Sequence, residues 1–241
     1  ELKALASWSL TGDVLEVLDP LLRRPGARVL DAGCGAGRWP IELKRRYPHA
    51  RITGLDFSAA VHAGGARVAR GPSFVEGPHF VRGDVGRMPF RDASFDAILC
   101  LGVLGHLEDP SAAVRDIARL LAPGGVCFAD VVNATRPYRW RRGWDPLGEF
   151  ERYESPHRLA ARFVEAGFRT VEAYAKDPAF TAFTALKPPP AWKASRPALY
   201  ETWWRTAVAF RRALACLPGA RGRARDGFYT VAVVRKPAVP P

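Results

Sequence analysis

The sequence predicts a doubly wound α/β fold with a mostly parallel sheet, and three observations support this prediction. Apolar runs typical of buried strands alternate with segments of helical periodicity through the first 131 residues. Several of these runs end in an acidic residue. The first run, Val29 to Asp31, leads into a turn with three glycines at alternate positions. Alternating strands and helices indicate one parallel sheet with helices on both faces.

The elements are expected in a regular order along the chain. Strands are expected near 28–32, 51–56, 79–82, 95–101, 125–131, 168–175 and 228–235. Helices are expected near 11–23, 37–47, 58–70, 110–121 and 155–167. Asp109 and Pro110 supply the N-cap and first-turn proline of the fourth helix, and the fifth is a capped helix that begins at Ser155 and ends at Gly167. The connection 176–226 is unusually long, which predicts an insertion before the last strand.

Length and composition favour one domain with an insertion. The chain has 241 residues, of which 48% are hydrophobic. It contains no run of 18 apolar residues and no signal-like opening segment, so neither a membrane span nor export is expected. The cysteines, at 34, 100, 127 and 216, have no C-x-x-C spacing. We interpret them as buried thiols rather than metal ligands or disulfides, which favours a cytoplasmic location.

The glycine turn predicts a nucleotide-like ligand. Gly33, Gly35 and Gly37 follow Asp31, and glycine permits both a sharp turn and close approach of a ligand. The next helix directs free N–H groups at that ligand. Arg38 stands where the dinucleotide fingerprint requires its third glycine, so NAD is disfavoured. No Gly-Lys-Ser/Thr follows, which excludes a P-loop, and a glycine-rich turn without a ligand remains the alternative.

A second strand ends in Asp56, which lies 23 residues after Gly33. This is close to the spacing at which an acid accepts hydrogen bonds from ribose hydroxyls. A helix N-cap is the alternative role for Asp56, although Ser58 can also serve as that cap. A third strand ends in Asp84.

Sequence blocks downstream resemble one known family. The block from Met88 to Phe95 reads MPF-RDA-SF, the block from Val103 reads VLGHLED, and the block from Leu120 reads LLAPGG. With the glycine turn, these blocks are similar in kind and order to the class I S-adenosylmethionine (SAM) methyltransferases of type 11, the ubiquinone-biosynthesis-like group. The resemblance covers roughly residues 28–131. It implies a Rossmann-like, seven-stranded, mostly parallel sheet with a final antiparallel strand and a helical lid insertion.

The resemblance also implies a cofactor site for SAM, which leaves as S-adenosylhomocysteine. The glycine turn would hold the methionyl moiety, Asp56 the ribose, and Asp84 with Val85 the adenine. Arg38 is expected to hold the SAM carboxylate, with a surface arginine as the alternative. The implied cofactor-binding residues are Asp31, Gly33, Gly35, Gly37, Arg38, Asp56, Phe57, Asp84, Val85, Leu101 and Gly102.

The resemblance further divides the chain into a core and two lid segments. Residues 28–175 and 227–236 form the expected SAM-binding core, residues 1–27 an N-terminal helical lid segment, and residues 176–226 part of the substrate lid. Aromatic residues gather in and near the lid segments, and packing onto the body is the alternative role for most of them. The candidate substrate residues are Trp8, Tyr138, Trp140, Tyr153, Tyr200 and Trp204.

His106 is the candidate general base, because it follows the fourth strand in a loop expected to face the cofactor. A structural histidine is the alternative. Gly105 stands where the family commonly has a first histidine. His157 and the pair Tyr153 and Glu154 are weaker candidates.

Charge is concentrated outside the recognised blocks. Residues 1–134 hold 16 basic and 15 acidic residues, whereas residues 135–241 hold 20 and nine. A basic half rich in aromatic residues suits a small aromatic or apolar acceptor with an anionic group, methylated at O, N or C. It also suits tRNA or another RNA. A SAM-binding module without turnover is the third hypothesis. No metal is expected, and the oligomeric state is not predicted.

Overall fold

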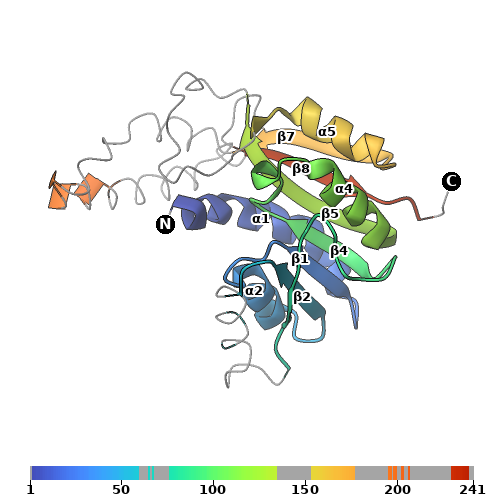
Figure 1. The fold of residues 1–241 in the computed structure, drawn as a ribbon. Helices are drawn as coiled ribbons and strands as arrows, with labels where there is room; N and C mark the ends of the chain where they lie inside the picture. The colour runs from blue at the N-terminus through green and yellow to red at the C-terminus, as the bar shows by residue number, and fades with distance from the viewer. Residues whose placement is uncertain are drawn as a thin grey trace.

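The computed structural model describes residues 2–59, 65, 67, 76–134, 153–176, 195–196, 198–199, 202–203, 206 and 229–238. The part of the chain described in this way forms one mixed sheet with helices on both faces (Figure 1). The main path of the sheet has the order β3-β2-β1-β4-β5-β8-β7. The predicted doubly wound, mostly parallel α/β fold is therefore confirmed.

The strand bounds are β1 (Arg28–Ala32), β2 (Arg51–Asp56), β3 (His79–Arg82), β4 (Phe95–Cys100), β5 (Leu121–Asn133), β6 (Tyr153–Glu154), β7 (Thr170–Lys176) and β8 (Tyr229–Arg235). Strands β3, β2, β1, β4 and β5 run parallel to one another. Strand β8 pairs antiparallel with both β5 and β7, which confirms the antiparallel final strand. The two-residue β6 pairs with the end of β5 and was not predicted, because so short a strand has no periodicity.

The helix bounds are α1 (Leu2–Leu22), α2 (Arg38–Arg46), η1 (Leu104–His106), α4 (Pro110–Leu120) and α5 (Pro156–Glu165). Both predicted caps are present: the Asp109 side chain accepts from the Ser111 N–H at 2.9 Å, and the Ser155 hydroxyl accepts from the Arg158 N–H at 3.4 Å. Most of the helix expected over 58–70 lies outside the described residues.

Two apolar clusters sandwich the sheet. One cluster joins the sheet to α4 and α5 through side chains such as Ile117 and Phe163. The other joins the opposite face to α1 and α2 through side chains such as Leu18 and Leu43. Alternate residues of each strand contribute to opposite clusters, as a strand buried on both faces requires. Figure 1 shows α4 and α5 together on one side of the sheet.

Helix α1 is longer than predicted, since it begins at Leu2 instead of near residue 11. Its side chains Leu10, Val14 and Leu18 recur at four-residue intervals and are buried against the sheet. Asp13 on the same helix accepts hydrogen bonds from Tyr174 Oη at 3.0 Å and Lys176 Nζ at 2.9 Å. Residues 10–22 are thus packed onto the body, and the lid role of residues 1–27 stays a prediction.

Strand β5 begins at Leu121, four residues before the predicted start. The Pro123-Gly124-Gly125 turn therefore lies inside the extended segment rather than ahead of it. Gly124 adopts a φ of 77°, and the pairing register of β4 with β5 shifts across this stretch. The backbone of residues 121–125 is thus irregular, and the shift in register between β4 and β5 accommodates it.

No helix in the described ranges is both long and apolar enough to cross a lipid bilayer. Cys34, Cys100 and Cys127 are buried free thiols, as predicted. Cys216 lies outside the described residues, and the cytoplasmic location stays a prediction.

Candidate functional site

The predicted cofactor residues gather at one edge of the sheet, where parallel strands present their carboxyl ends. Asp31 lies on β1 and Asp56 ends β2. Gly102 follows β4, which lies next to β1, and Asp84 follows β3, which lies next to β2. Ligands of open α/β sheets bind outside this edge. The fold therefore brings residues from four separated sequence blocks to one place.

The three glycines of the turn adopt left-handed backbone conformations that favour glycine, with φ values of 80° at Gly33, 51° at Gly35 and 78° at Gly37. A Cβ on Gly33 would lie 2.2 Å from Val103 Cγ2, and a Cβ on Gly37 would lie 2.6 Å from Phe80 Cζ. A Cβ on Gly35 would meet nothing within 4 Å. The outer two glycines are thus required by packing, whereas Gly35 faces open space.

Asp56 fastens this turn to β2. Its Oδ2 accepts from the Gly35 N–H at 2.9 Å, and its Oδ1 accepts from the Ser58 N–H at 2.9 Å. The carbonyl of Leu55 also accepts from the N–H groups of Gly33 at 2.7 Å and Cys34 at 2.9 Å. Each carboxylate oxygen has two lone pairs, so Asp56 retains acceptor capacity for two ribose hydroxyls. Asp56 thus combines the turn-anchoring role with the geometry expected of a ribose acceptor.

Helix α2 starts directly after the turn, with Gly37 as a cap that offers no side-chain acceptor. Its first N–H groups are therefore not capped by a side chain, which suits an anionic ligand group. The Arg38 guanidinium lies 5.3 Å from the centroid of the Trp39 ring. Burial lowers the pKa of Arg38, while Glu42 raises it. Arg38 is half-buried rather than a solvated surface arginine.

Asp31 is a buried carboxyl group that lacks a cationic partner among the described residues. It is 2% exposed, and its Oδ2 has no hydrogen-bond partner there. Burial, followed by the charge of Asp56, raises the pKa of Asp31 to about 7. An uncompensated buried carboxylate is costly unless a cation or a donor approaches it. SAM carries a sulfonium and an ammonium group, so this carboxyl fits the cofactor implied by the sequence.

The residues expected at the adenine, Asp84 and Val85, follow the end of β3. Asp84 is exposed, and its Oδ1 accepts from the Gly86 N–H at 2.8 Å, while Val85 is buried. Phe57, next to Asp56, is 77% exposed. The exposed ring of Phe57, at the carboxyl edge of the sheet, is available for stacking or apolar contact with a ligand.

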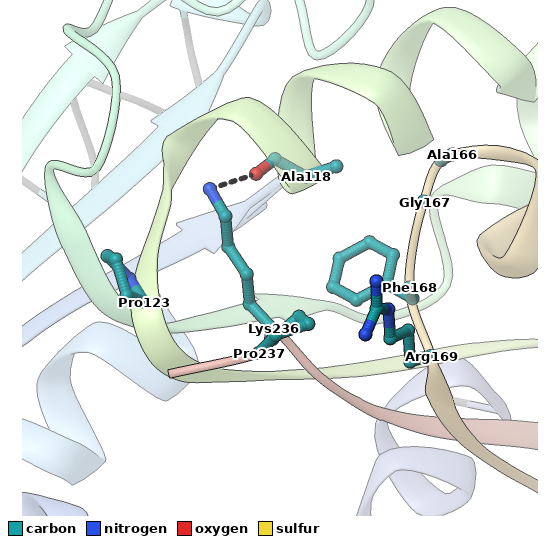
Figure 2. Close-up of a pocket in the computed structure, with 8 residues that line it drawn as sticks. All are labelled: Ala118, Pro123, Ala166, Gly167, Phe168, Arg169, Lys236 and Pro237. Atoms are coloured by element: carbon teal, nitrogen blue, oxygen red, sulfur yellow. Dashed lines mark hydrogen bonds between the residues drawn. The ribbon is translucent and has the colours of Figure 1, made fainter. Parts of the chain in front are cut away.

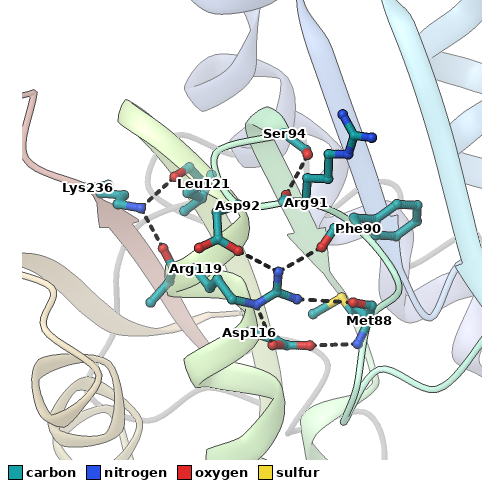
Figure 3. A network of polar contacts seen from close by, with 10 residues as sticks. Met88, Phe90, Arg91, Asp92, Ser94, Asp116, Arg119, Leu121 and Lys236 are labelled. Carbon is teal, nitrogen blue, oxygen red and sulfur yellow. Dashed lines mark hydrogen bonds and ion pairs between the residues drawn. The ribbon is translucent and has the colours of Figure 1, made fainter.

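The loop between β3 and β4 is held by a polar network centred on Arg119 of α4 (Figure 3). Arg119 Nη1 donates to Phe90 O at 2.7 Å and to Asp92 Oδ1 at 2.8 Å, and Nη2 donates to Met88 O at 3.1 Å. Asp116 accepts from Arg119 Nε at 3.0 Å and from the Met88 N–H at 2.6 Å. The MPF block therefore has a structural role here: it lets α4 hold the chain that follows Asp84 and Val85.

Asp130 is a buried acid next to the candidate site, and the sequence analysis did not single it out. It lies on β5, is 3% exposed, and accepts from the Gly102 N–H at 2.7 Å. Gly102 has a φ of 65°, so the turn after β4 is fixed in a left-handed conformation by a carboxyl group from the next strand. An acid inside the otherwise apolar run from Val126 to Val132 is the signal that was available.

His106 ends the short helix η1 after β4, in the predicted loop. It is half-buried, and its N–H donates to Val103 O at 2.9 Å. The loop position of His106 agrees with the sequence analysis, and its role as a base stays a prediction.

Glu154, a weaker candidate base, is a buried ion-pair partner. Its Oε1 lies 2.6 Å from Arg162 Nη2 and accepts from Arg162 Nε at 2.7 Å. Arg162 Nη1 also donates to Ser111 Oγ at 3.3 Å. The pair joins β6, α5 and the start of α4, which explains a carboxylate at this position without catalysis.

The candidate substrate residues are only partly placed. Trp8 belongs to α1 and Tyr153 to β6. The other four, Tyr138, Trp140, Tyr200 and Trp204, lie outside the described residues. Their substrate role stays a prediction.

Two hollows lie at the opposite, amino-terminal edge of the sheet. One is bounded by the ends of α4 and α5 and by the end of β8 (Figure 2). There Lys236 Nζ donates to Ala118 O at 2.8 Å and Leu121 O at 2.7 Å, and caps the carbonyl end of α4. The other hollow is lined by the first residues of β1 to β4. Neither contains the glycine turn.

Comparison with known proteins agrees with this site. Residues 30–129 match the family model of a methyltransferase domain. This part of the chain is similar to the class I SAM-dependent methyltransferases, and SAM is the cofactor that the similarity implies. Within that class, the matching model is that of the type 11 domain.

Two curated relatives are O-methyltransferases by name. A malonyl-[acyl-carrier protein] O-methyltransferase of Halorhodospira halophila is 30% identical over 158 residues, which are 64% of this chain and 52% of that protein. A ubiquinone biosynthesis O-methyltransferase of Xanthomonas oryzae pv. oryzae is 35% identical over 121 residues, 50% of this chain and 49% of that one. The chain thus spans about half the length of these relatives.

A solved structure has a different activity in its name. The [4+2]-cyclase SpnF is 25% identical to this chain, with a TM-score of 0.63 over 96% of this chain and 81% of SpnF. The shared fold is therefore found in a protein named for cyclisation rather than methyl transfer.

Proposed function

We propose that this protein transfers the methyl group of SAM to a small aromatic or apolar acceptor that bears an anionic group. The observation that supports it most directly is the buried carboxyl of Asp31, which has no cationic partner among the described residues and lies near the open Gly35 turn. Asp56, the uncapped start of α2 and the exposed Phe57 complete a site of the right chemistry for SAM.

The residues of this site act mainly by positioning. Bound SAM supplies a methyl group that is already activated by its sulfonium, so alignment with the acceptor accounts for much of the rate. Asp56 orients the ribose while it holds Gly35 in place. Asp31 compensates positive charge at the glycine turn, and Arg38 with the α2 N-terminus binds the carboxylate. His106 accepts the acceptor's proton where that acceptor is a hydroxyl.

Calorimetric titration with SAM tests the cofactor site. The wild-type protein is expected to bind, and Asp56→Ala to lose about 1–3 kcal/mol of binding free energy, because two ribose hydrogen bonds and the anchor of Gly35 are removed. Glu76→Ala is the matched control, since Glu76 is an exposed acid just ahead of β3 at the opposite edge. A wild-type protein that does not bind SAM would contradict the proposal at its root.

The acceptor class is tested by release of S-adenosylhomocysteine. Both named relatives are O-methyltransferases, which favours an oxygen acceptor here. Hydroxyaromatic carboxylates are expected to turn over faster than their neutral methyl esters, because the lid segments are rich in arginine. His106→Ala is expected to slow that turnover without changing SAM affinity. Equal rates for acids and esters would exclude an anionic acceptor requirement.

Two other functions have specific support. The basic half of the chain favours an RNA acceptor, and 20 basic against nine acidic residues fall in 135–241. The likeness to SpnF, a protein named for cyclisation, favours a function on this fold other than methyl transfer, such as a SAM-binding module without turnover. SAM binding without any S-adenosylhomocysteine release, across small acids and RNA alike, would favour the second of these.

A further inference from the structure

We propose that Asp130 is a charge-positioning residue of the SAM site, which favours the sulfonium of SAM over the neutral sulfur of S-adenosylhomocysteine. This inference rests on the proposed function, because it assumes that SAM occupies the carboxyl edge of the sheet. It adds a residue from β5 to a site otherwise built on β1 to β4.

Strand alternation places Asp130 on the same face of the sheet as Asp31. On β1, Val29 packs in the α1 and α2 cluster, whereas Leu30 packs in the opposite cluster. On β5, Phe128 packs in the α1 and α2 cluster, whereas Ala129 packs in the opposite one. Side chains alternate along a strand, so both carboxyl groups project from the α1 and α2 face.

The pairing register then locates the two carboxyl groups around the end of β4. Asp31 pairs with Leu99, and Leu99 pairs with Phe128. Asp130 is therefore two strand spacings from Asp31, about 10 Å, and two residues nearer the carboxyl edge. The turn at Leu101 and Gly102 lies between them, so the carboxyl groups flank the turn from both sides.

Asp130 has no cationic partner within the described part of the chain. Its hydrogen bond comes from the uncharged N–H of Gly102. Lys176, the buried lysine on β7, is paired with Asp13 of α1 at 2.9 Å. Tyr174, which lies in the same cross-strand row as Asp130 through Val231, also donates to Asp13. Lys176 is thus paired with Asp13, and no cation is paired with Asp130 among the residues that the structure describes.

The thiol of Cys100, at the end of β4, interacts electrostatically with Asp130. The pKa of the Cys100 thiol is raised by burial and then by Cys127, Asp130 and Asp31. Burial raises the pKa of Asp130 itself to about 7, against the opposing hydrogen bond from Gly102. A buried carboxyl in this environment gains its charge readily when a cation arrives.

Space for that cation is present at the turn. Gly102 is exposed, and a Cβ built on it would meet nothing within 4 Å. A ligand that extends from the open Gly35 turn across the end of β4 would pass Gly102, whose N–H is hydrogen-bonded to Asp130. SAM and S-adenosylhomocysteine differ by one methyl group and one positive charge, so a carboxylate at this position discriminates between them.

Titration of each variant with both SAM and S-adenosylhomocysteine tests the inference. Asp130→Asn keeps an oxygen that can accept from Gly102 and removes the charge. It is expected to weaken SAM binding about tenfold or more and to leave S-adenosylhomocysteine binding within about twofold. Asp130→Thr, a second uncharged acceptor suited to a strand, replaces it if the Asn variant does not fold. Asp96→Asn, at the amino-terminal end of β4, is the control and is expected to change neither affinity.

The outcomes separate the roles of Asp130. Equal losses for the two ligands would mean that Asp130 only anchors the Gly102 turn, and no loss for either would mean that it has no part in binding. Both results overturn the inference. Failure of the wild-type protein to bind SAM overturns the proposed function instead, so that result is distinguishable.

Discussion

At the scale of the residue, the buried carboxyl of Asp31 makes stability depend on pH. Its pKa is about 7 in the folded protein and near 3.8 when solvated. Between about pH 4 and pH 7, this carboxyl stays protonated in the folded protein but ionises in the unfolded chain. The free energy of unfolding therefore falls progressively as the pH rises through this range. This loss of stability follows from burying the Asp31 carboxyl without a cationic partner among the described residues.

Thermal unfolding of ligand-free Asp31→Asn at pH 5 and pH 8 checks this argument. The gain in stability over wild type is expected to be larger at pH 8, by about 2 kcal/mol, because only the wild-type side chain ionises. Asp92→Asn is the control, since it is the same substitution at an exposed carboxyl group. An Asp31→Asn effect of the same size at both pH values would contradict the assignment.

At the scale of the element, Arg119 joins α4 to the loop between β3 and β4 (Figure 3). This loop includes Asp84 and Val85, the residues expected at the adenine. Arg119→Ala removes donors to Met88 O, Phe90 O and Asp92. It is expected to lower stability by about 1–3 kcal/mol and to speed amide exchange across 84–92. Arg119→Lys is expected to restore little, because one ammonium cannot reproduce the guanidinium geometry.

Arg115→Ala is the matched control for this helix, since Arg115 is exposed on the same α4. Exchange measured by mass spectrometry is expected to rise in 84–92 for Arg119→Ala alone. Equal exchange in both variants would show that the loop is held by its own backbone rather than by α4.

At the scale of the whole molecule, the uneven distribution of charge is compatible with two kinds of methyl acceptor, a small molecule and an RNA. The excess of basic residues falls in 135–241, outside the SAM-binding blocks. Under the small-molecule proposal, affinity for tRNA is expected to be weak and without preference over other RNA. Under the RNA alternative, affinity falls steeply and linearly on a log–log plot against salt. Titration of labelled tRNA from low to physiological salt decides between them.

The sequence alone determined the strands of the recognised blocks, the caps of α4 and α5, and the glycine turn, because periodicity, capping and glycine spacing are local properties of the chain. Only the tertiary structure showed that Gly33 and Gly37 serve packing, through contacts with Val103 and Phe80, whereas Gly35 faces open space. Only the structure paired Asp130 with Gly102 and fixed Glu154 to Arg162. The first contact joins residues that are 28 positions apart in the sequence, and the second joins residues that are eight positions apart. Burial and long-range pairing depend on which segments pack together, and no local pattern encodes that.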